Sequence, residues 1–196
     1  GRRIGPRRLV WRYDPVLVYG PYTAAWHLEV FGRYCRLFSG ATDTGVFSFV
    51  DLYAKTRRAM PRLRPVTAGD MELLAAGFVL RAQDAGIRLY TCCEEGDFAR
   101  FGIGQAACVD PERIEEITGR PVNDSRDPGQ RPGCGCARSV DIGAYGTCSH
   151  GCAYCYAAGP AYSAEHRPDS PLLAGTVGPD DRMPPDPGRQ TTLWSL

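Results

Sequence analysis

The sequence has no apolar run near the roughly 20 residues that a membrane-spanning helix requires, so we expect no such helix. It has no internal repeat and no low-complexity block, which argues against a repeat architecture. Its charge is almost balanced, with 23 Lys and Arg against 22 Asp and Glu, so overall charge demands neither nucleic acid nor a membrane as partner. The remaining composition, 43% apolar and 23% charged over 196 residues, is typical of one soluble globular domain.

Cysteine, by contrast, is abundant: the chain has nine, and all but Cys35 follow residue 90. Such an uneven distribution is typical of a site rather than of a disulfide framework spread along the chain. Metal binding in a reducing cytosol fits it better, so we expect a cytoplasmic protein. We expect Cys35 to be buried as a small hydrophobic residue, and the nearby His27 to lie at the surface.

The sharpest motif lies in residues 131–157, which hold five of the cysteines. Cys148, Cys152 and Cys155 have the spacing C-x3-C-x2-C, and Tyr154 directly precedes the third thiol. Three thiolates on a short loop can bind three irons of a [4Fe-4S] cube and leave the fourth iron open to another ligand. The aromatic residue favours iron over other metals at this motif.

Radical S-adenosylmethionine (SAM) enzymes use such a tripod, and the motif resembles their C-x3-C-x-aromatic-C. In those enzymes the amine and carboxylate of SAM chelate the fourth iron, and an electron from the cluster yields a 5′-deoxyadenosyl radical. Two other interpretations stay open. A structural zinc site would take its fourth thiolate from Cys134 or Cys136, and a pair of disulfides would need no metal.

Strand and helix patterns alternate in the first part of the chain. The expected elements are strands at residues 9–18, 46–53 and 87–95 and helices at 23–39, 68–85 and 111–118. Thr67 and Asp110 are the expected N-caps of the last two helices, and Gly119 the expected stop. Alternation at this spacing predicts parallel strands with right-handed crossovers. The fold class we predict is α/β, a partial (β/α) barrel like that of TIM or radical SAM proteins, because three strands do not close a barrel.

Two domains are expected on this basis. Residues 1–119 form the partial barrel, and residues 120–196 form a cysteine-rich iron-sulfur segment with an irregular tail. Past residue 157 the chain shows little periodicity, and we expect loops there.

Polar residues gather near the carboxyl ends of the expected strands: Arg12, Asp14, Asp51, Cys92 and Glu94. Active sites of (β/α) barrels lie on this rim. We predict that Arg12 orients a carboxylate or phosphate, that Asp14 and Asp51 hold hydroxyls or protons, and that Glu94 acts as acid or base. For Arg12 and Asp14, a salt bridge inside a barrel is the alternative.

The third expected strand carries the adjacent thiols Cys92 and Cys93. Because side chains alternate along a strand, only one of the two should point at a given site.

A basic segment follows the second expected strand, with no acidic residue in it: Lys55, Arg57, Arg58, Arg62 and Arg64. We expect a solvated loop there, and contact with phosphate or carboxylate groups is the alternative.

Several segments together resemble the bacterial family of proteins called domain of unknown function 1848. They are RIGPRRLVWRYDPV, FSFVDLYAKT, TCCEE, ACVD, RPGCGCARSVDIGAYGTCSHGCAYCYA and HRPDSPLLAG. The cysteine cluster of that family is itself similar to the radical SAM motif. The resemblance implies that this chain corresponds to the C-terminal two thirds, with the first barrel strands missing, which agrees with a chain that starts at Gly1 rather than Met.

The resemblance also implies a cofactor arrangement. It implies a [4Fe-4S] cluster on Cys148, Cys152 and Cys155, with Tyr154 next to the cofactor and SAM as a possible second cofactor. It singles out a further group, Cys92, Cys108, Cys134 and Cys136, as the positions that match the family's other cysteines. Four thiolates are the number that a second [4Fe-4S] cluster or an all-thiolate zinc site requires, so we expect one of these there. The order differs from ordinary radical SAM proteins, because the cysteine loop here follows the last strand instead of the first.

Two functions from different classes follow. The first is a radical-SAM-like iron-sulfur enzyme, which needs an electron donor and acts on an unknown substrate held at the strand ends. The second is a non-catalytic iron-sulfur or zinc module that binds a protein or, through the basic segment, a nucleic acid.

Overall fold

The computed structural model describes residues 1–122, 125–126, 129–140, 143, 145–157, 167, 169–170, 172 and 175–181. The chain divides into two compact units. The first comprises Gly1–Asp141 with Ala153–Tyr156, and the second comprises Ile142–Cys152 with Ala157–Leu196. Most of the chain beyond residue 157, where loops were predicted, lies outside the described residues.

The first unit is built on a parallel sheet, which confirms the α/β class. Its strands are β1 (Trp11–Val16), β2 (Thr44–Phe49), β3 (Arg88–Thr91) and β4 (Gly104–Gln105). They pair in the order β1-β2-β3-β4, so neighbours in sequence are neighbours in space. The described sheet is open, with β1 and β4 at its edges, and is not closed into a barrel.

Four helices accompany the sheet: α1 (Ala24–Phe38), α2 (Ala54–Ala59), α3 (Ala68–Asp84) and α4 (Pro111–Thr118). Two short 3-10 turns, η1 (Pro6–Arg8) and η2 (Ala99–Phe101), complete the described elements. Of the helices described, none is both long and apolar enough to span a bilayer.

The predicted helix caps are confirmed. The Thr67 hydroxyl accepts from the backbone N–H of Asp70 at 3.1 Å, and it fixes the start of α3. Asp110 accepts from the N–H of Arg113 at 3.2 Å at the start of α4. Gly119 ends α4 in the left-handed region at φ 66°, where a side chain would be strained.

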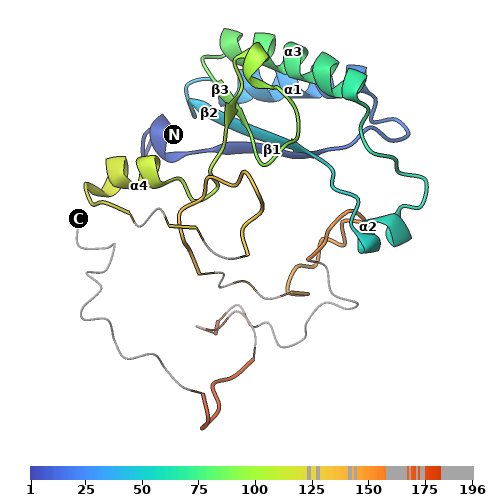
Figure 1. Cartoon of the computed structure of the whole chain (residues 1–196). Helices are drawn as coiled ribbons and strands as arrows, with labels where there is room; N and C mark the ends of the chain where they lie inside the picture. Colours follow the sequence, from blue (N-terminus) through green and yellow to red (C-terminus); the bar gives the residue numbers. More distant parts are fainter. Residues whose placement is uncertain are drawn as a thin grey trace. The chain divides into compact units, whose positions relative to one another are not determined.

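Helices α1 and α3 lie side by side over one face of the sheet (Figure 1) and close the main core against it. Phe31 of α1 stacks on Phe78 of α3 with 3.9 Å between ring centroids, and both rings are fully buried. Phe47 of β2 meets Phe78 edge-on, with centroids 5.4 Å apart. These aromatic contacts anchor the helices to the strands and leave the opposite face of the sheet to other segments of the unit.

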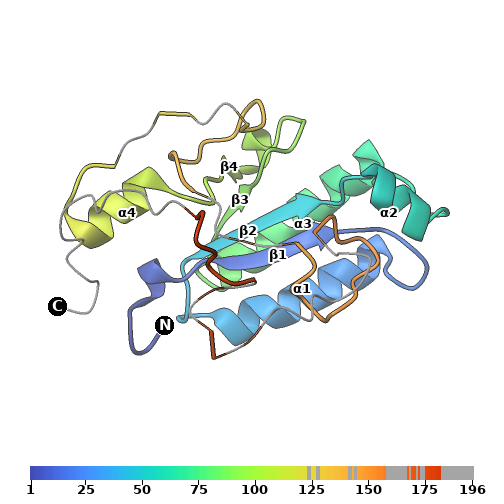
Figure 2. The same ribbon diagram turned by 90° about the horizontal axis from the view of Figure 1, so that it is seen from below.

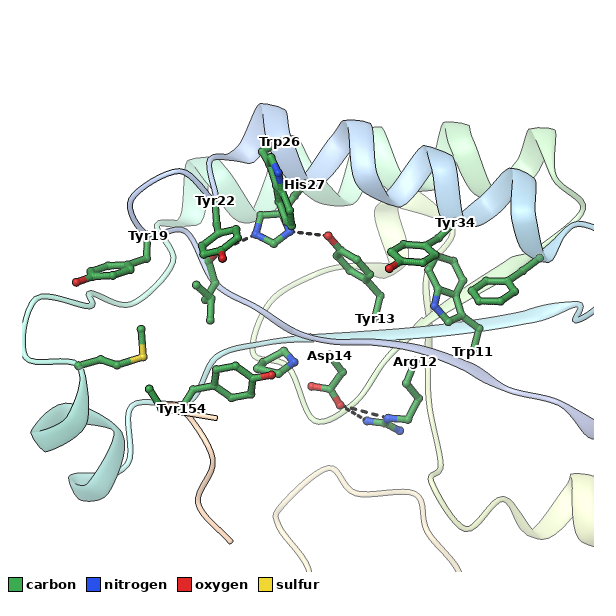
Figure 3. Close-up of a pocket in the computed structure, with 15 residues that line it drawn as sticks. Trp11, Arg12, Tyr13, Asp14, Tyr19, Tyr22, Trp26, His27, Tyr34 and Tyr154 are labelled. Atoms are coloured by element: carbon green, nitrogen blue, oxygen red, sulfur yellow. Dashed lines mark hydrogen bonds and ion pairs between the residues drawn. The ribbon is translucent and has the colours of Figure 1, made fainter. Parts of the chain in front are cut away.

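Side-chain alternation along β1 places aromatic residues on one face and charged residues on the other. Trp11 and Tyr13 point toward α1, whereas Arg12 and Asp14 point away from it (Figure 3). The side chains of Trp11 and Tyr13 pack against Phe31, with centroids 4.8 and 5.2 Å apart. The face of β1 that is turned away from α1 therefore carries its charged pair.

The strands are shorter than predicted. The register of β1 against β2 shifts between Tyr13 and Val16, around Pro15, which has no N–H to give to the ladder. Strand β3 ends at Thr91 because the chain bends at Cys92 and Cys93. Apolar composition alone did not reveal where each ladder stops.

Two local predictions were wrong. Residues 54–59 form helix α2, so the basic segment is partly helical rather than a loop. His27 is buried rather than at the surface, since its ring lies between the Tyr13 hydroxyl at 2.7 Å and the Leu17 carbonyl at 2.8 Å. Cys35, as predicted, is buried in the core.

Candidate functional site

The carboxyl ends of the strands bring together the polar residues predicted to form a rim. The parallel strands β1, β2 and β3 lie side by side (Figure 2), so their carboxyl ends are at the same edge of the sheet. Side chains at this edge line one cavity. The Ser48 hydroxyl donates a hydrogen bond to Asp14 across β1 and β2. A carboxylate oxygen of Glu94 accepts from the backbone N–H of Phe49 at 2.8 Å.

These residues line a cavity of about 480 Å³, which we term the rim cavity. Its walls combine charged groups, aromatic rings and thiols. The lining side chains include Arg12, Asp14, Ser48, Asp51, Tyr53, Cys92, Cys93, Glu94, Arg131, Cys134, Tyr154, Cys155 and Tyr156. All of them belong to the first unit. All four predicted catalytic side chains, Arg12, Asp14, Asp51 and Glu94, therefore lie on one cavity.

Arg12 is fully engaged within the protein. Its Nη2 and Nε donate to Asp14 at 2.6 and 3.2 Å, and its Nη1 donates to the Cys108 sulfur at 3.1 Å. Burial opposes the charged guanidinium, but the bonds to Asp14 and the nearby thiol prevail and raise the pKa of Arg12. The arrangement matches the salt-bridge alternative for this pair.

Glu94 is a carboxyl group of the rim cavity whose pKa is changed by burial. Burial raises the pKa of Glu94 to about 7, although the N–H of Phe49 acts in the opposite direction. The nearby carboxylates of Asp51 and Asp14 raise this pKa further. A carboxyl that titrates near neutrality can either give or take a proton, which suits the acid-base role predicted for it.

A second ion pair on the rim cavity was missed from the sequence. Arg131 donates to Asp51 at 2.8 Å and to the Tyr53 hydroxyl, and its guanidinium lies 5.9 Å from the Tyr53 ring centroid. Arg131 is 80 positions from Asp51, and no local pattern reports such a pairing. In the sequence, Arg131 is notable only as the first residue of a Gly-rich loop.

The thiols after β3 correct one prediction. Cys92 and Cys93 both line the rim cavity, whereas strand alternation would direct only one of them to it. Alternation fails because β3 ends at Thr91 and Cys93 adopts φ 54°, a left-handed conformation uncommon for residues other than glycine. Adjacent thiols at such a bend can face the same space.

Two of the four cysteines predicted to form a second metal site, Cys92 and Cys108, are in contact. The sulfurs of Cys92 and Cys108 are 3.4 Å apart, since each residue follows one of the neighbouring strands β3 and β4. The contact with Cys108, aided by Arg12, lowers the pKa of Cys92, and the same contact together with burial raises the pKa of Cys108.

The other two cysteines predicted for this second metal site, Cys134 and Cys136, lie on the loop that begins at Arg131. The sulfur of Cys136 accepts from the backbone N–H groups of Cys108 at 3.0 Å and Val109 at 3.4 Å. Cys134 interacts with Cys93, which together with burial raises the pKa of Cys93. The structure thus brings Cys92, Cys108, Cys134 and Cys136 into one region, together with Cys93.

The C-x3-C-x2-C motif is divided between the two units. Cys155 and Tyr154 belong to the first unit and line the rim cavity, and the Tyr154 carbonyl accepts from Thr56 of α2 at 3.3 Å. Cys148 and Cys152 belong to the second unit and are exposed. Thiolates are suitable donors for iron-sulfur clusters and for zinc. Among the described residues, no three His, Cys, Asp or Glu side chains already surround a point where a metal ion would sit.

A larger cavity of about 710 Å³ lies between β1 and the start of α1 (Figure 3). Its wall is mostly aromatic and includes Trp11, Tyr13, Tyr19, Tyr22, Trp26, Tyr34 and Tyr154. It shares Arg12, Asp14 and Tyr154 with the rim cavity, so the two cavities adjoin at these residues.

Fold and site together define an α/β protein with an open parallel sheet and a thiol-rich cavity at the strand ends. Residues 1–157 match the family described as "Domain of unknown function (DUF1848)", and the chain belongs to this family. No curated protein and no solved structure matched the chain in the same comparisons.

Proposed function

We propose that this protein is an iron-sulfur enzyme of radical SAM type that acts on a substrate bound in the rim cavity. The observation that carries the proposal is the position of Cys155. This third cysteine of the motif lies on the wall of the same cavity as Arg12, Asp14, Asp51 and Glu94. A redox cofactor held by this cysteine would therefore be adjacent to polar groups able to bind a substrate.

The donor set fits an iron-sulfur cluster. Cys148, Cys152 and Cys155 are all unpaired thiols, and the spacing of the motif keeps them within reach of one another along the chain. When bound, a reduced [4Fe-4S] cluster supplies an electron for the cleavage of SAM. Tyr154, between the two cavities, is the side chain we assign to contact the cofactor.

The residues of the rim cavity then have separate tasks. Glu94 holds or releases a proton near neutral pH, because burial raises its pKa to about 7. Arg131 and Asp51 present a charged pair beside the Tyr53 ring, and the Arg131 guanidinium is suited to a substrate carboxylate or hydroxyl. Arg12 holds Asp14 in place rather than binding substrate itself, since its three nitrogen atoms already donate within the protein.

We further propose that the sheet is an arc of a (β/α) barrel. Sequential order, parallel pairing and two helices on one face are the features of such an arc. In a doubly wound sheet the strand order would reverse at some point, and helices would cover both faces.

A non-catalytic metal module is the second candidate. It is favoured by the basic residues of the segment 55–64, where Lys55, Arg57, Arg58, Arg62 and Arg64 are all exposed. Within the part of the chain that the structure describes, none of the five forms an ion pair with an acidic side chain. Such a patch could contact nucleic acid phosphates.

One experiment separates the two candidates. The protein is purified without oxygen, reduced with dithionite, and examined by EPR with and without SAM, and 5′-deoxyadenosine is then assayed. We expect a cluster signal that SAM perturbs, together with 5′-deoxyadenosine, and loss of both in Cys155→Ser but not in the matched core variant Cys35→Ala. An iron-free protein that binds nucleic acid in a salt-dependent manner would favour the module and reject the enzyme.

A further inference from the structure

Four thiols outside the C-x3-C-x2-C motif converge on one place. Strands β3 and β4 are neighbours, and the chain delivers Cys92 just past the end of one and Cys108 just past the other. Their sulfurs are 3.4 Å apart. In a tetrahedral zinc site with Zn–S bonds of about 2.3 Å, neighbouring sulfurs lie about 3.8 Å apart. The observed separation is therefore close to one edge of a site for a single ion.

The third thiol is held by backbone donors. The N–H groups of Cys108 and Val109 both point at the sulfur of Cys136. The loop is fixed against the same segment, because the N–H of Ala137 donates to the Val109 carbonyl at 2.9 Å. These two N–H donors hold the Cys136 sulfur next to the segment that carries Cys108.

Arg12 adds charge compensation at the same place. Four thiolates around a divalent ion carry two net negative charges, and the Arg12 guanidinium donates to the Cys108 sulfur at 3.1 Å. Donors of this kind around the ligands commonly tune and orient a metal site. Arg12 itself is anchored by Asp14 at 2.6 Å.

The fourth thiol is Cys134, two residues before Cys136. It lines the rim cavity together with Cys92 and Cys93, so it lies near the same group of sulfurs. Among the described residues, no three potential ligands already surround a position for a metal ion, so the four thiols are near one another without enclosing an ion. Metal binding commonly completes the arrangement of its ligands, and a short loop such as 131–137 can close over an ion.

We propose that Cys92, Cys108, Cys134 and Cys136 bind one zinc ion in a closed four-thiolate site, separate from the cluster motif. The site would tie the carboxyl ends of β3 and β4 to the loop that supplies Arg131. All four positions around the ion would be occupied by protein, so the role of the zinc is structural. It would stabilise the wall of the rim cavity rather than take part in its chemistry.

The test begins with metal content. Chains expressed with zinc available are analysed for zinc and iron per chain, as wild type and as the variants Cys108→Ser and Cys136→Ser. We expect one zinc in the wild type and its loss in both variants. Two controls, the adjacent thiol variant Cys93→Ser and the core variant Cys35→Ala, should keep it. Unchanged zinc in Cys108→Ser or Cys136→Ser, or its loss in Cys93→Ser, overturns the assignment.

A second measurement does not depend on the folding of any variant. Wild-type protein freed of metal is titrated with Co²⁺, whose spectrum reports geometry and sulfur ligation. Tetrahedral d–d bands with sulfur-to-cobalt charge transfer at one equivalent support the site, and a pale octahedral spectrum overturns it. Cys155→Ser distinguishes this proposal from the proposed function, because that variant should lose cluster iron and keep zinc. Iron instead of zinc on the four thiols would also overturn the proposal.

Discussion

Arg12 and Cys108, 96 positions apart, are joined by a hydrogen bond of 3.1 Å from Nη1 to Sγ. The same guanidinium holds Asp14 at 2.6 Å through Nη2. One side chain thus links the acidic end of the rim cavity to the thiols after β3 and β4. Its position on the face of β1 that is turned away from α1 follows directly from strand alternation.

Removing this link should destabilise the first unit modestly. We expect Arg12→Gln to lower the free energy of unfolding by about 1 kcal/mol, because the pair is partly exposed and solvent screens it. Chemical denaturation with urea measures the change. The matched control is Arg88→Gln, whose ion pair with Asp43 is long at 3.8 Å and well exposed, and whose loss should have almost no effect. Equal losses in both variants would contradict a specific role for Arg12.

Glu94 should matter for stability as a hydrogen-bond acceptor. Its carboxylate accepts the N–H of Phe49 at 2.8 Å, so Glu94→Ala leaves that donor without a partner. We expect a loss of about 1–3 kcal/mol in the free energy of unfolding. Glu94→Gln keeps an acceptor oxygen and should lose less. If the two variants unfold at the same urea concentration, the contact does not contribute as the structure indicates.

The aromatic core should be sensitive to truncation. Phe78 is fully buried and stacks on Phe31, and we expect Phe78→Ala to cost about 3–5 kcal/mol. Leu80→Ala on the same helix α3 is the control, since Leu80 is 62% exposed and its truncation should cost less than about 0.5 kcal/mol. Urea denaturation compares the two. A small effect at Phe78 would mean that α3 does not pack on the sheet as described.

His27 should make stability depend on pH. Burial lowers the pKa of His27 below its usual 6.5, and the Leu17 carbonyl offsets this only in part. The unfolded chain therefore binds a proton more readily than the folded one, so stability is full above about pH 6.5 and falls as the pH drops below it. His27→Gln should show a weaker fall. Denaturation curves at about pH 7.5 and pH 5.5 test this, and parallel losses in both proteins would argue against it.

Much of the fold could be predicted because its signals are local. The N-caps Thr67 and Asp110 and the stop at Gly119 act through bonds to residues three or four positions away. The gathering of Asp14, Asp51 and Glu94 on one cavity could be predicted as well, because parallel strands share one carboxyl edge. Side-chain alternation along strands and helix capping depend on local geometry, so both can be predicted from a single sequence.

What the sequence did not reveal depends on contacts between distant segments. The burial of His27 depends on such contacts, because the chain after β1 places the Leu17 carbonyl 2.8 Å from its Nε2. Arg131 pairs with Asp51 because the loop crosses the strand ends, which no periodicity records. Cys93 joins the cavity because of a left-handed bend at a residue other than glycine, and strand alternation cannot anticipate such a bend.

The central claim is that the C-x3-C-x2-C motif binds an iron-sulfur cluster beside the rim cavity. Iron and acid-labile sulfide per chain, measured on protein made without oxygen, test it most directly when wild type is compared with Cys155→Ser and Cys35→Ala. The account predicts iron and sulfide in equal amounts in wild type and Cys35→Ala, and their loss in Cys155→Ser. Iron and sulfide that are absent from all three proteins, or unchanged in Cys155→Ser, would contradict it.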